Sequence, residues 1–351
     1  MQTRRYDMDR ALEPIWQGES VYLESVMLVG GRNRVDLAYP ARRVLEVRSS
    51  DLNTLYEEGT DYALEDGALV IPEGSRLPRF AHDEYYLSAP VPNGSFECAL
   101  GGHILFGEGG LFHARQFLVS YEHDPSPLLP QPQAQLGLLN KSRALLEGGN
   151  TLRVLFYGDS ITTGCNCSDF MNLEPFLPSW MEMTMDGLAR RYPRAHLFAH
   201  NTAVGGTATE WGLENARERA ARLKPDLCFL AFGMNDGTAK IAPQRYISQT
   251  QGIMAEVRAA NPECEFVLVA TMLPNREVKG FDGLQRDYLP DLLNLKGPGC
   301  ALADMTSLHG ALLGRKRYED MTGNNVNHPN DFLSRVYAQL MLRTLEAEPN
   351  R

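Results

Sequence analysis

The chain has 351 residues, of which 43% are hydrophobic and 22% are charged, and its formal net charge at pH 7 is −10. These values are typical of a globular protein that is long enough for two domains. The acidic balance argues against nucleic acid as the main partner, because proteins that bind a phosphate backbone usually carry a basic surface.

The first residues contain Arg4 and Arg5 with no apolar segment after them, so no secretory leader is expected. No run approaches the roughly 18 apolar residues of a membrane span. We therefore expect a cytoplasmic protein without a membrane partner, while secretion of a processed form stays open. The sequence does not indicate an oligomeric state.

Residues 1–123 have the apolar alternation of β-strands, most clearly in 22–28 and 113–121. Short apolar runs at 43–48 and 68–71 are separated by turn-rich pieces. Many short strands without a convincing helix predict an all-β sandwich or jelly-roll domain over this range.

The composition changes over residues 124–150. Four prolines lie between Asp124 and Pro132. Proline fixes φ and removes a hydrogen-bond donor, so this segment is predicted to be a semi-rigid linker. A short helical pattern at 136–147 is expected to lead into a second domain.

Residues 151–351 alternate short apolar runs with helical periodicity. Helices are predicted at 178–191, 210–224 and 329–346. The candidate strands are 153–157, 196–200, 226–232, 265–271 and 300–305. This order predicts a doubly wound α/β domain with a parallel sheet buried on both faces, whose functional residues follow the carboxyl ends of the strands.

The six cysteines are scattered, and Cys165 and Cys167 form the one close pair. A zinc site needs about four ligands, and no second pair is present. We expect free thiols and neither a metal nor an organic cofactor.

Gly158-Asp159-Ser160 directly follows the first apolar strand of the second half. A glycine here permits a sharp turn, and Ser160 would then open a helix with its oxygen exposed. Taken alone, the pattern fits equally well a plain turn in which Asp159 or Ser160 caps the helix.

Three further segments follow strands or precede the last helix. Gly205 and Gly206 offer backbone N–H groups, and Asn235 in Gly-Met-Asn-Asp offers a side-chain donor for an oxyanion. Proline at position 329, as the first helical residue, would hold His328 at the start of the last helix. Asp331 is then expected to be a favourable charge in the first helical turn.

These segments, in this order, resemble the SGNH (GDSL-like) hydrolases over roughly residues 150–345. The resemblance implies that Ser160 is the nucleophile, that His328 is its base, and that Gly206 and Asn235 help to form the oxyanion hole. Gly205 is the second choice for the glycine. An N-terminal β-sandwich before such a domain is also similar to carbohydrate esterase family two and its relatives, which deacetylate sugars.

The chain departs from the family at one position, because Asn325 stands where the family usually has the aspartate that orients the histidine. A neutral side chain cannot stabilise an imidazolium as a carboxylate does. Another group, such as a backbone carbonyl, Asp320 or Asp304, could orient His328. A Ser–His dyad and a centre with weak activity are equally compatible with the sequence.

The sequence thus predicts a serine ester hydrolase that removes short acyl groups, acetyl first, from an oligosaccharide or small-molecule ester. Lipid esters or acyl thioesters are the alternative substrates within the same chemistry. A hypothesis of another class is a glycan-binding protein whose active site has eroded at Asn325.

Overall fold

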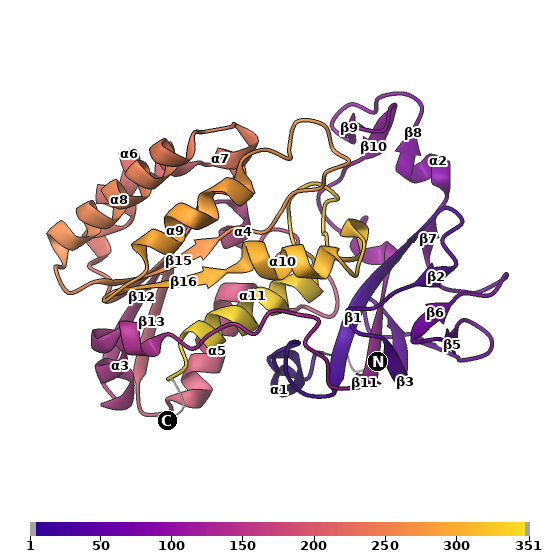
Figure 1. Ribbon diagram of the computed structural model, residues 1–351, viewed down its shortest axis with the longest axis horizontal. Coiled ribbons are helices and arrows are strands. Elements are labelled where there is room, and N and C mark those ends of the chain that lie inside the picture. Colours follow the sequence, from indigo (N-terminus) through magenta and orange to yellow (C-terminus); the bar gives the residue numbers. More distant parts are fainter. Residues whose placement is uncertain (1–4, 348–351) are drawn as a thin grey trace.

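The computed structural model describes residues 5–347. The start of the segment considered for a leader, residues 1–4, and the end of the predicted second domain, residues 348–351, lie outside these residues. Two halves lie side by side in Figure 1, a layered α/β half and a strand-rich half. Both the strand-rich N-terminal half and the parallel-sheet α/β domain predicted from the sequence are confirmed.

The strand-rich half is built on a sheet with the order β4-β3-β11-β1-β7 and two smaller sheets, β2-β6-β5 and β8-β10-β9. Its strands are β1 (Ser20–Val29), β2 (Arg34–Val35), β3 (Ala41–Ser49), β4 (Leu55–Tyr56), β5 (Ala63–Glu65), β6 (Ala68–Val70), β7 (Arg79–Phe80), β8 (Tyr86–Leu87), β9 (Ser95–Glu97), β10 (His103–Leu105) and β11 (Gln116–His123). Its helical turns are α1 (Met8–Ala11), α2 (His82–Tyr85) and η1 (His113–Arg115). The strand predicted from residue 113 therefore begins only at Gln116. A jelly-roll topology stays a prediction.

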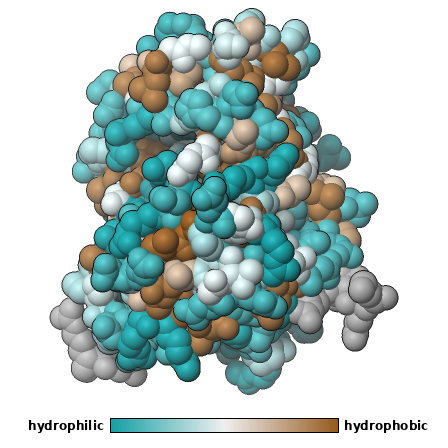
Figure 2. Space-filling view, turned by 90° about the vertical axis from the view of Figure 1, so that its right-hand side faces the viewer, coloured by the Kyte–Doolittle hydropathy of each residue, from teal (hydrophilic) through white to brown (hydrophobic). Residues whose placement is uncertain are grey.

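The central strand β1 pairs antiparallel with β11 and parallel with β7, and β11 pairs antiparallel with β3. Figure 2 shows the outer face of this half as a mosaic in which hydrophilic residues predominate. The exposed large apolar side chains of this half, such as Leu45, Leu55 and Leu100, are dispersed along the chain. Single exposed apolar residues are ordinary for a protein surface.

The segment after β11 packs against the α/β half. Leu129 and Gln135 are buried, and the Gln135 side chain exchanges hydrogen bonds with the backbone of Leu302. The lead-in helix is present as η2 (Leu136–Leu138) followed by α3 (Asn140–Glu147). The predicted domain boundaries at 123/124 and 150/151 stay predictions.

The α/β half contains a parallel sheet with the strand order β13-β12-β14-β15-β16. Its strands are β12 (Thr151–Gly158), β13 (His196–Asn201), β14 (Leu227–Ala231), β15 (Glu265–Ala270) and β16 (Cys300–Asp304). The helices and helical turns are α4 (Ser160–Thr163), α5 (Trp180–Arg191), α6 (Thr209–Arg219), η3 (Ala221–Leu223), α7 (Met234–Thr238), α8 (Pro243–Ala260), η4 (Gln285–Tyr288), α9 (Leu289–Leu295), α10 (Met305–Leu313), η5 (Tyr318–Asp320) and α11 (Asp331–Thr344).

Successive residues of each strand point to opposite faces of this sheet. Val154 and Phe156 of β12 pack in one core with α5 and α11, whereas Leu155 and Tyr157 pack in a second core with α6, α8 and α9. The first core continues into the strand-rich half, where it includes Val26 of β1. One apolar core therefore runs through both halves.

Two details differ from the expectations. Strand β13, at one edge of the sheet, is not buried on both faces, since most of its residues are exposed. The last helix does not begin at Pro329: Asn330 is its N-cap, accepting the N–H of Leu333, and Asp331 is its first residue. Asp331 therefore lies in the first turn, as expected.

A third apolar cluster fixes where the halves meet. It combines Phe80, Tyr85 and Phe112 of the strand-rich half with Val278 and Val326 of the α/β half. Val326 lies two residues before His328, so this cluster anchors the loop that carries the histidine. Among residues 5–347, no helix combines the length and the apolar character needed to cross a membrane.

Candidate active site

Ser160 lies where β12 turns into α4. An added Cβ at Gly158 would lie 2.3 Å from the carbonyl oxygen of Ala231, so this turn accepts only glycine. Asp159 is the N-cap of α4, and its side chain accepts the N–H of Ile161 at 3.0 Å. Ser160 follows as the first helical residue and is 6% exposed. The capping role of Asp159 and the presentation of Ser160 at a helix start therefore occur together.

The structure brings Ser160 and His328 together. The Nε2 atom of His328 lies 2.8 Å from the Oγ atom of Ser160, and the histidine is 7% exposed. The backbone before the histidine is held by Asn324, whose Oδ1 accepts the N–H groups of Val326, Asn327 and His328. A serine hydroxyl within hydrogen-bond reach of a fixed imidazole is the arrangement that activates a nucleophile.

The second ring nitrogen of His328 faces Asn166. The Nδ1 atom lies 2.7 Å from Oδ1 of Asn166, whose Nδ2 donates to the carbonyl of Gly323 at 3.3 Å. An added Cβ at Gly323 would lie 2.3 Å from Cβ of Asn166, so glycine is needed for this approach. With the amide in this orientation, Nδ1 carries the proton and Nε2 is left to accept the hydroxyl proton of Ser160.

A carboxylate of the strand-rich half also reaches the histidine. Oε1 of Glu108 lies 3.5 Å from Nδ1 of His328, and it accepts a hydrogen bond from Nδ2 of Asn324 at 3.1 Å. Partial burial acts to raise the pKa of Glu108. Hydrogen bonding to His328 and the charge of that ring, with further hydrogen bonds from Asn324 and Asn166, outweigh burial and hold the pKa below its ordinary value.

The residues proposed from the sequence to orient His328 are engaged elsewhere. Asp320 forms an ion pair with Arg32 at 2.7 Å, and Asp304 caps α10. Asn325 accepts the hydroxyl of Tyr85 at 2.6 Å. The candidates Asp320 and Asp304 are therefore wrong, and the side chain that holds the ring is Asn166.

The glycine loop and Asn235 lie on the other side of Ser160. An added Cβ on Gly205 would lie 3.6 Å from Cβ of Ser160, and Gly206 has a φ of +75°. Nδ2 of Asn235 donates to the carbonyl of Thr207 at 2.8 Å, which leaves its second N–H free for another acceptor. The loop thus bridges Ser160 and Asn235, and the oxyanion role of Gly206 and Asn235 stays a prediction.

Two buried carboxyl groups lie behind these residues. Burial raises the pKa of Asp159 to about 7, and the nearby charge of Asp236 adds to this effect. Burial also raises the pKa of Asp236, although its Oδ1 accepts the N–H of Thr209 at 3.0 Å. Asp236 therefore ties the start of α6 to α7, the helix that carries Asn235.

The cysteines near the site are free thiols. Cys167 is buried with its sulfur 3.1 Å from the Ser334 hydroxyl, and burial raises the pKa of the half-buried Cys165 thiol. Over the part of the chain that the structure describes, no three His, Cys, Asp or Glu side chains are grouped so as to hold a metal ion.

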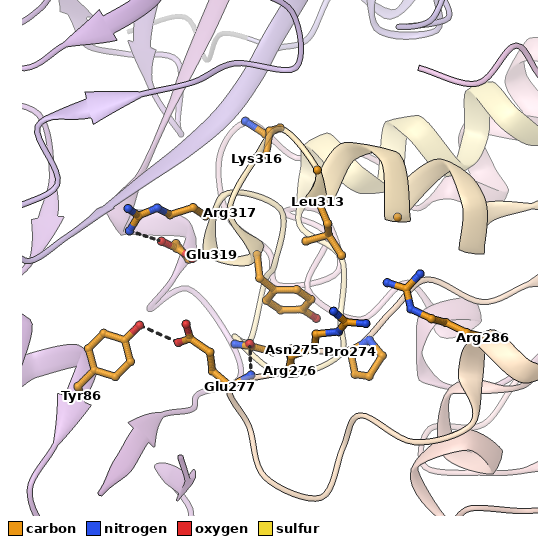
Figure 3. Close-up of a pocket in the computed structure, with 13 residues that line it drawn as sticks. Tyr86, Pro274, Asn275, Arg276, Glu277, Arg286, Leu313, Lys316, Arg317 and Glu319 are labelled. Atoms are coloured by element: carbon orange, nitrogen blue, oxygen red, sulfur yellow. Dashed lines mark hydrogen bonds and ion pairs between the residues drawn. The ribbon is translucent and has the colours of Figure 1, made fainter. Parts of the chain in front are cut away.

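Two hollows lie near the site. One of about 520 Å³ lies between the halves and is lined by Tyr86, Arg276, Arg286 and Glu319, with the Tyr86 hydroxyl donating to Glu277 (Figure 3). Neither Ser160 nor His328 lines it, so we locate the site by the contact between these two side chains. The other hollow, about 460 Å³, is lined by Thr163 near the end of α4 and by the following apolar side chains: Phe156, Phe170, Met181 and Met185.

Sequence reasoning missed Asn166, Asn324 and Glu108. Asn166 lies between Cys165 and Cys167, and the two cysteines suggested only a question about metal binding. Asn324 immediately precedes Asn325, the residue singled out by its spacing to His328. Glu108 follows Gly107 and precedes two further glycines. An acidic residue among glycines indicates a functional loop, but the sequence does not reveal that Glu108 contacts His328, which is far away along the chain.

Comparison with known proteins identifies the family of the chain. The model of the GDSL-like Lipase/Acylhydrolase family matches residues 156–333, which is just over half of the 351-residue chain. The chain belongs to this family. No curated protein matches it.

A solved structure shares the fold. A two-domain esterase active on acetylated mannans is 21% identical with a TM-score of 0.50, over 62% of this chain and 55% of that chain. This chain therefore spans just over half the length of that esterase. An acetylxylan esterase from Geobacillus stearothermophilus is 15% identical with a TM-score of 0.44, over 56% of this chain and 95% of that chain.

Proposed function

We propose that the protein is a serine-dependent carboxylic ester hydrolase. The observation that carries this proposal is the 2.8 Å contact between the hydroxyl of Ser160 and Nε2 of His328, whose other nitrogen faces Asn166 at 2.7 Å. Membership of a lipase and acylhydrolase family supports the same reaction type.

The proposed reaction has two stages, acylation of Ser160 and hydrolysis of the acyl-serine. His328 takes the hydroxyl proton on Nε2 while Oγ of Ser160 attacks the ester carbonyl carbon. The oxyanion that forms is met by the N–H groups of Ser160 and Gly206 and by the free N–H of Asn235. His328 then protonates the leaving alcohol. A water molecule, deprotonated by His328, attacks the acyl-serine, which releases the carboxylic acid and restores Ser160.

The substrate we propose is a short acyl ester of a carbohydrate, acetyl first. Ser160 and His328 are only 6% and 7% exposed, so the reacting atoms are accessible to a small acyl group more readily than to a bulky one. An esterase active on acetylated mannans shares this fold. The strand-rich half, which brings Glu108 to His328, would form one wall beside the sugar.

One observation favours a lipid ester or an acyl thioester as the alternative. The hollow of about 460 Å³ that includes Thr163 is lined by Phe170, Met181 and Met185, which are side chains that suit an alkyl chain. Thr163 donates its hydroxyl to the carbonyl of Ser160 at 2.7 Å, so this hollow starts close to the nucleophile.

A series of p-nitrophenyl esters from acetyl to long acyl chains, together with acetylated xylan, tests the proposal. We expect turnover of the acetyl ester that decreases with chain length, acetate release from the xylan, and no activity above background for Ser160→Ala. The same preparations should be compared by thermal unfolding, so that a loss of activity is separated from a loss of folded protein.

A preference for long chains would transfer the assignment to lipid or thioester substrates. Activity equal to that of Ser160→Ala on every ester would contradict the proposal and favour a glycan-binding protein.

A further inference from the structure

The proposed reaction creates a positive charge that Asn166 cannot offset. When His328 takes the proton of Ser160, its ring becomes an imidazolium, and a carboxylate beside Nδ1 stabilises that state in serine hydrolases. Asn166 accepts the Nδ1 proton at 2.7 Å, which sets the tautomer, but its amide is neutral. A charge must come from elsewhere if the centre is to work at full rate.

Within residues 5–347, the carboxylate that forms an ion-pair contact with His328 is that of Glu108, at 3.5 Å from Nδ1. One side chain, that of Asn324, connects it to the histidine loop. Nδ2 of Asn324 donates to Oε1 of Glu108, while Oδ1 of the same asparagine accepts the N–H of His328. The carboxylate and the ring are therefore fixed relative to one another by a single side chain.

The loop that carries Glu108 is anchored on both sides. Before it, the carbonyl of Leu105 accepts a hydrogen bond from Nδ2 of Asn325 at 2.8 Å. After it, Phe112 is fully buried in the apolar cluster that also contains Val326. Asn325, which stands where the family usually has an aspartate, thus holds the loop that carries Glu108.

The charge state of Glu108 fits this role. The hydrogen bonds and the charge of His328 outweigh partial burial and keep its pKa below the ordinary value, so the group is ionised at neutral pH. The other titratable groups nearby are Cys165, whose pKa is raised by burial and by the charge of Glu108, and Asp159, whose pKa burial raises to about 7. Neither is a hydrogen-bond partner of Nδ1.

We propose that Glu108 is a positioning residue of the catalytic centre, supplying from the strand-rich half the negative charge that stabilises protonated His328. The inference rests on the proposed function of Ser160 and His328. It makes the strand-rich half a part of the catalytic centre rather than a separate binding module. Because the Glu108 side chain is 52% exposed, solvent weakens the interaction, and the expected effect is moderate.

The test compares Glu108→Gln, Glu108→Asp and the wild-type protein by steady-state kinetics and by NMR titration of the His328 ring, assigned by its absence in His328→Gln. For Glu108→Gln we expect kcat to fall about 10- to 100-fold, less than the roughly 10⁴-fold that follows when the tautomer is also lost. The midpoint of the ring titration should move to lower pH by about 0.5 to 1 unit. Glu108→Asp keeps the charge and should recover part of both effects.

Glu97→Gln is the matched control, because this carboxylate of the strand-rich half pairs with Lys279 of the α/β half and not with His328. It should leave kcat and the ring titration unchanged.

A ring titration that is the same in Glu108→Gln and in the wild-type protein would overturn the inference, whatever the esterase activity. A raised KM with unchanged kcat and titration would also overturn it, since Glu108 would then contact the substrate. A shifted titration in a protein without activity on any ester would support the contact and contradict the proposed function instead.

Discussion

Two clusters of polar side chains join the strand-rich half to the α/β half, and they differ in their surroundings. The buried ion-pair cluster consists of Glu24, Arg32, Lys316 and Asp320, with two negative and two positive side chains that are almost inaccessible to solvent. The His328 cluster consists of Glu108, Asn166, Asn324 and His328, and its carboxylate is half exposed.

Each charge of the buried ion-pair cluster has an oppositely charged partner, although Nε of Arg32 has no hydrogen-bond partner. Arg32 binds Asp320 through two hydrogen bonds of 2.7 and 2.9 Å, and Lys316 pairs with Glu24. Burial alone would raise the pKa of Asp320, but the charges of Arg32 and Lys316 hold it below the ordinary value. Such a cluster fixes how two surfaces dock and offers no group to a substrate.

The His328 cluster lies at the edge of the same interface and contains one carboxylate, two amides and an imidazole. Its histidine is bonded on one side to a serine hydroxyl and on the other to an amide, and it has a carboxylate at 3.5 Å. Under the proposed function, residues that join the two halves take part in the chemistry where their contact is open to solvent beside Ser160.

The largest expected effect breaks the His328 cluster at its nucleophile. Ser160→Ala should lower kcat by about 10⁴- to 10⁶-fold, because the acyl-enzyme cannot form. The same variant should unfold within a few degrees of the wild-type protein, since one hydrogen bond is lost. Initial rates with p-nitrophenyl acetate measure the first effect, and thermal unfolding measures the second. A large fall in the unfolding temperature would mean that Ser160 is needed for the stability of the fold.

Removing a charge from the buried ion-pair cluster should act on stability. Arg32→Ala leaves Asp320 buried without its bidentate partner, so we expect the free energy of unfolding to fall by about 3–5 kcal/mol in urea titration. Arg43→Ala is the control, because Arg43 pairs with Glu122 on the surface, and it should leave the stability nearly unchanged. Equal losses for the two variants would refute the contrast.

Asn324 should affect both stability and activity. Asn324→Ala removes the acceptor of three backbone N–H groups, which predicts a loss of about 1–3 kcal/mol together with reduced kcat. Asn324→Asp keeps that acceptor but no longer donates to Glu108, so its stability loss should be smaller than that of the alanine variant. Urea titration measures the free energy of unfolding of both variants. A larger loss for Asn324→Asp than for Asn324→Ala would contradict the prediction.

A dependence on pH separates two buried carboxyl groups. Asp320 has cationic partners and a lowered pKa, whereas burial raises the pKa of Asp159 to about 7. Between about pH 4 and 7, folded Asp159 binds a proton that the unfolded chain releases, so the free energy of unfolding decreases as pH rises, by up to about 1.4 kcal/mol per unit.

Asp159→Asn keeps the acceptor for the Ile161 N–H and cannot ionise, so its stability should fall less between pH 4 and 7 than that of the wild-type protein. Urea titrations at several pH values give both slopes. Parallel curves would mean that Asp159 is already ionised in the folded protein at low pH.

The pattern of apolar runs predicted the parallel sheet, and the resemblance to SGNH hydrolases implied the proximity of Ser160 and His328. The short apolar runs coincide with β12, β14, β15 and β16, because strands buried on both faces need continuous apolar residues. Ser160 follows the end of one such strand, and His328 lies just before the cap of the last helix.

The orientation of His328 could not be predicted in the same way. Motif spacing pointed to Asn325, but the geometry depends on tertiary contacts across long stretches of chain. Asn166 is 162 residues from His328, and Glu108 is 216 residues from Asn324. The exposure of β13 was also missed, because its residue types do not reveal that it is left uncovered at one edge of the sheet.

The central claim is that Ser160 and His328 form a nucleophile and base. The most direct measurement is covalent labelling with a serine-reactive fluorophosphonate, followed by mass spectrometry of the peptides. The account predicts one phosphonyl group on Ser160 in the wild-type protein and a strongly slowed reaction in His328→Ala. Labelling of a different residue, or an equal rate without the histidine, would contradict it.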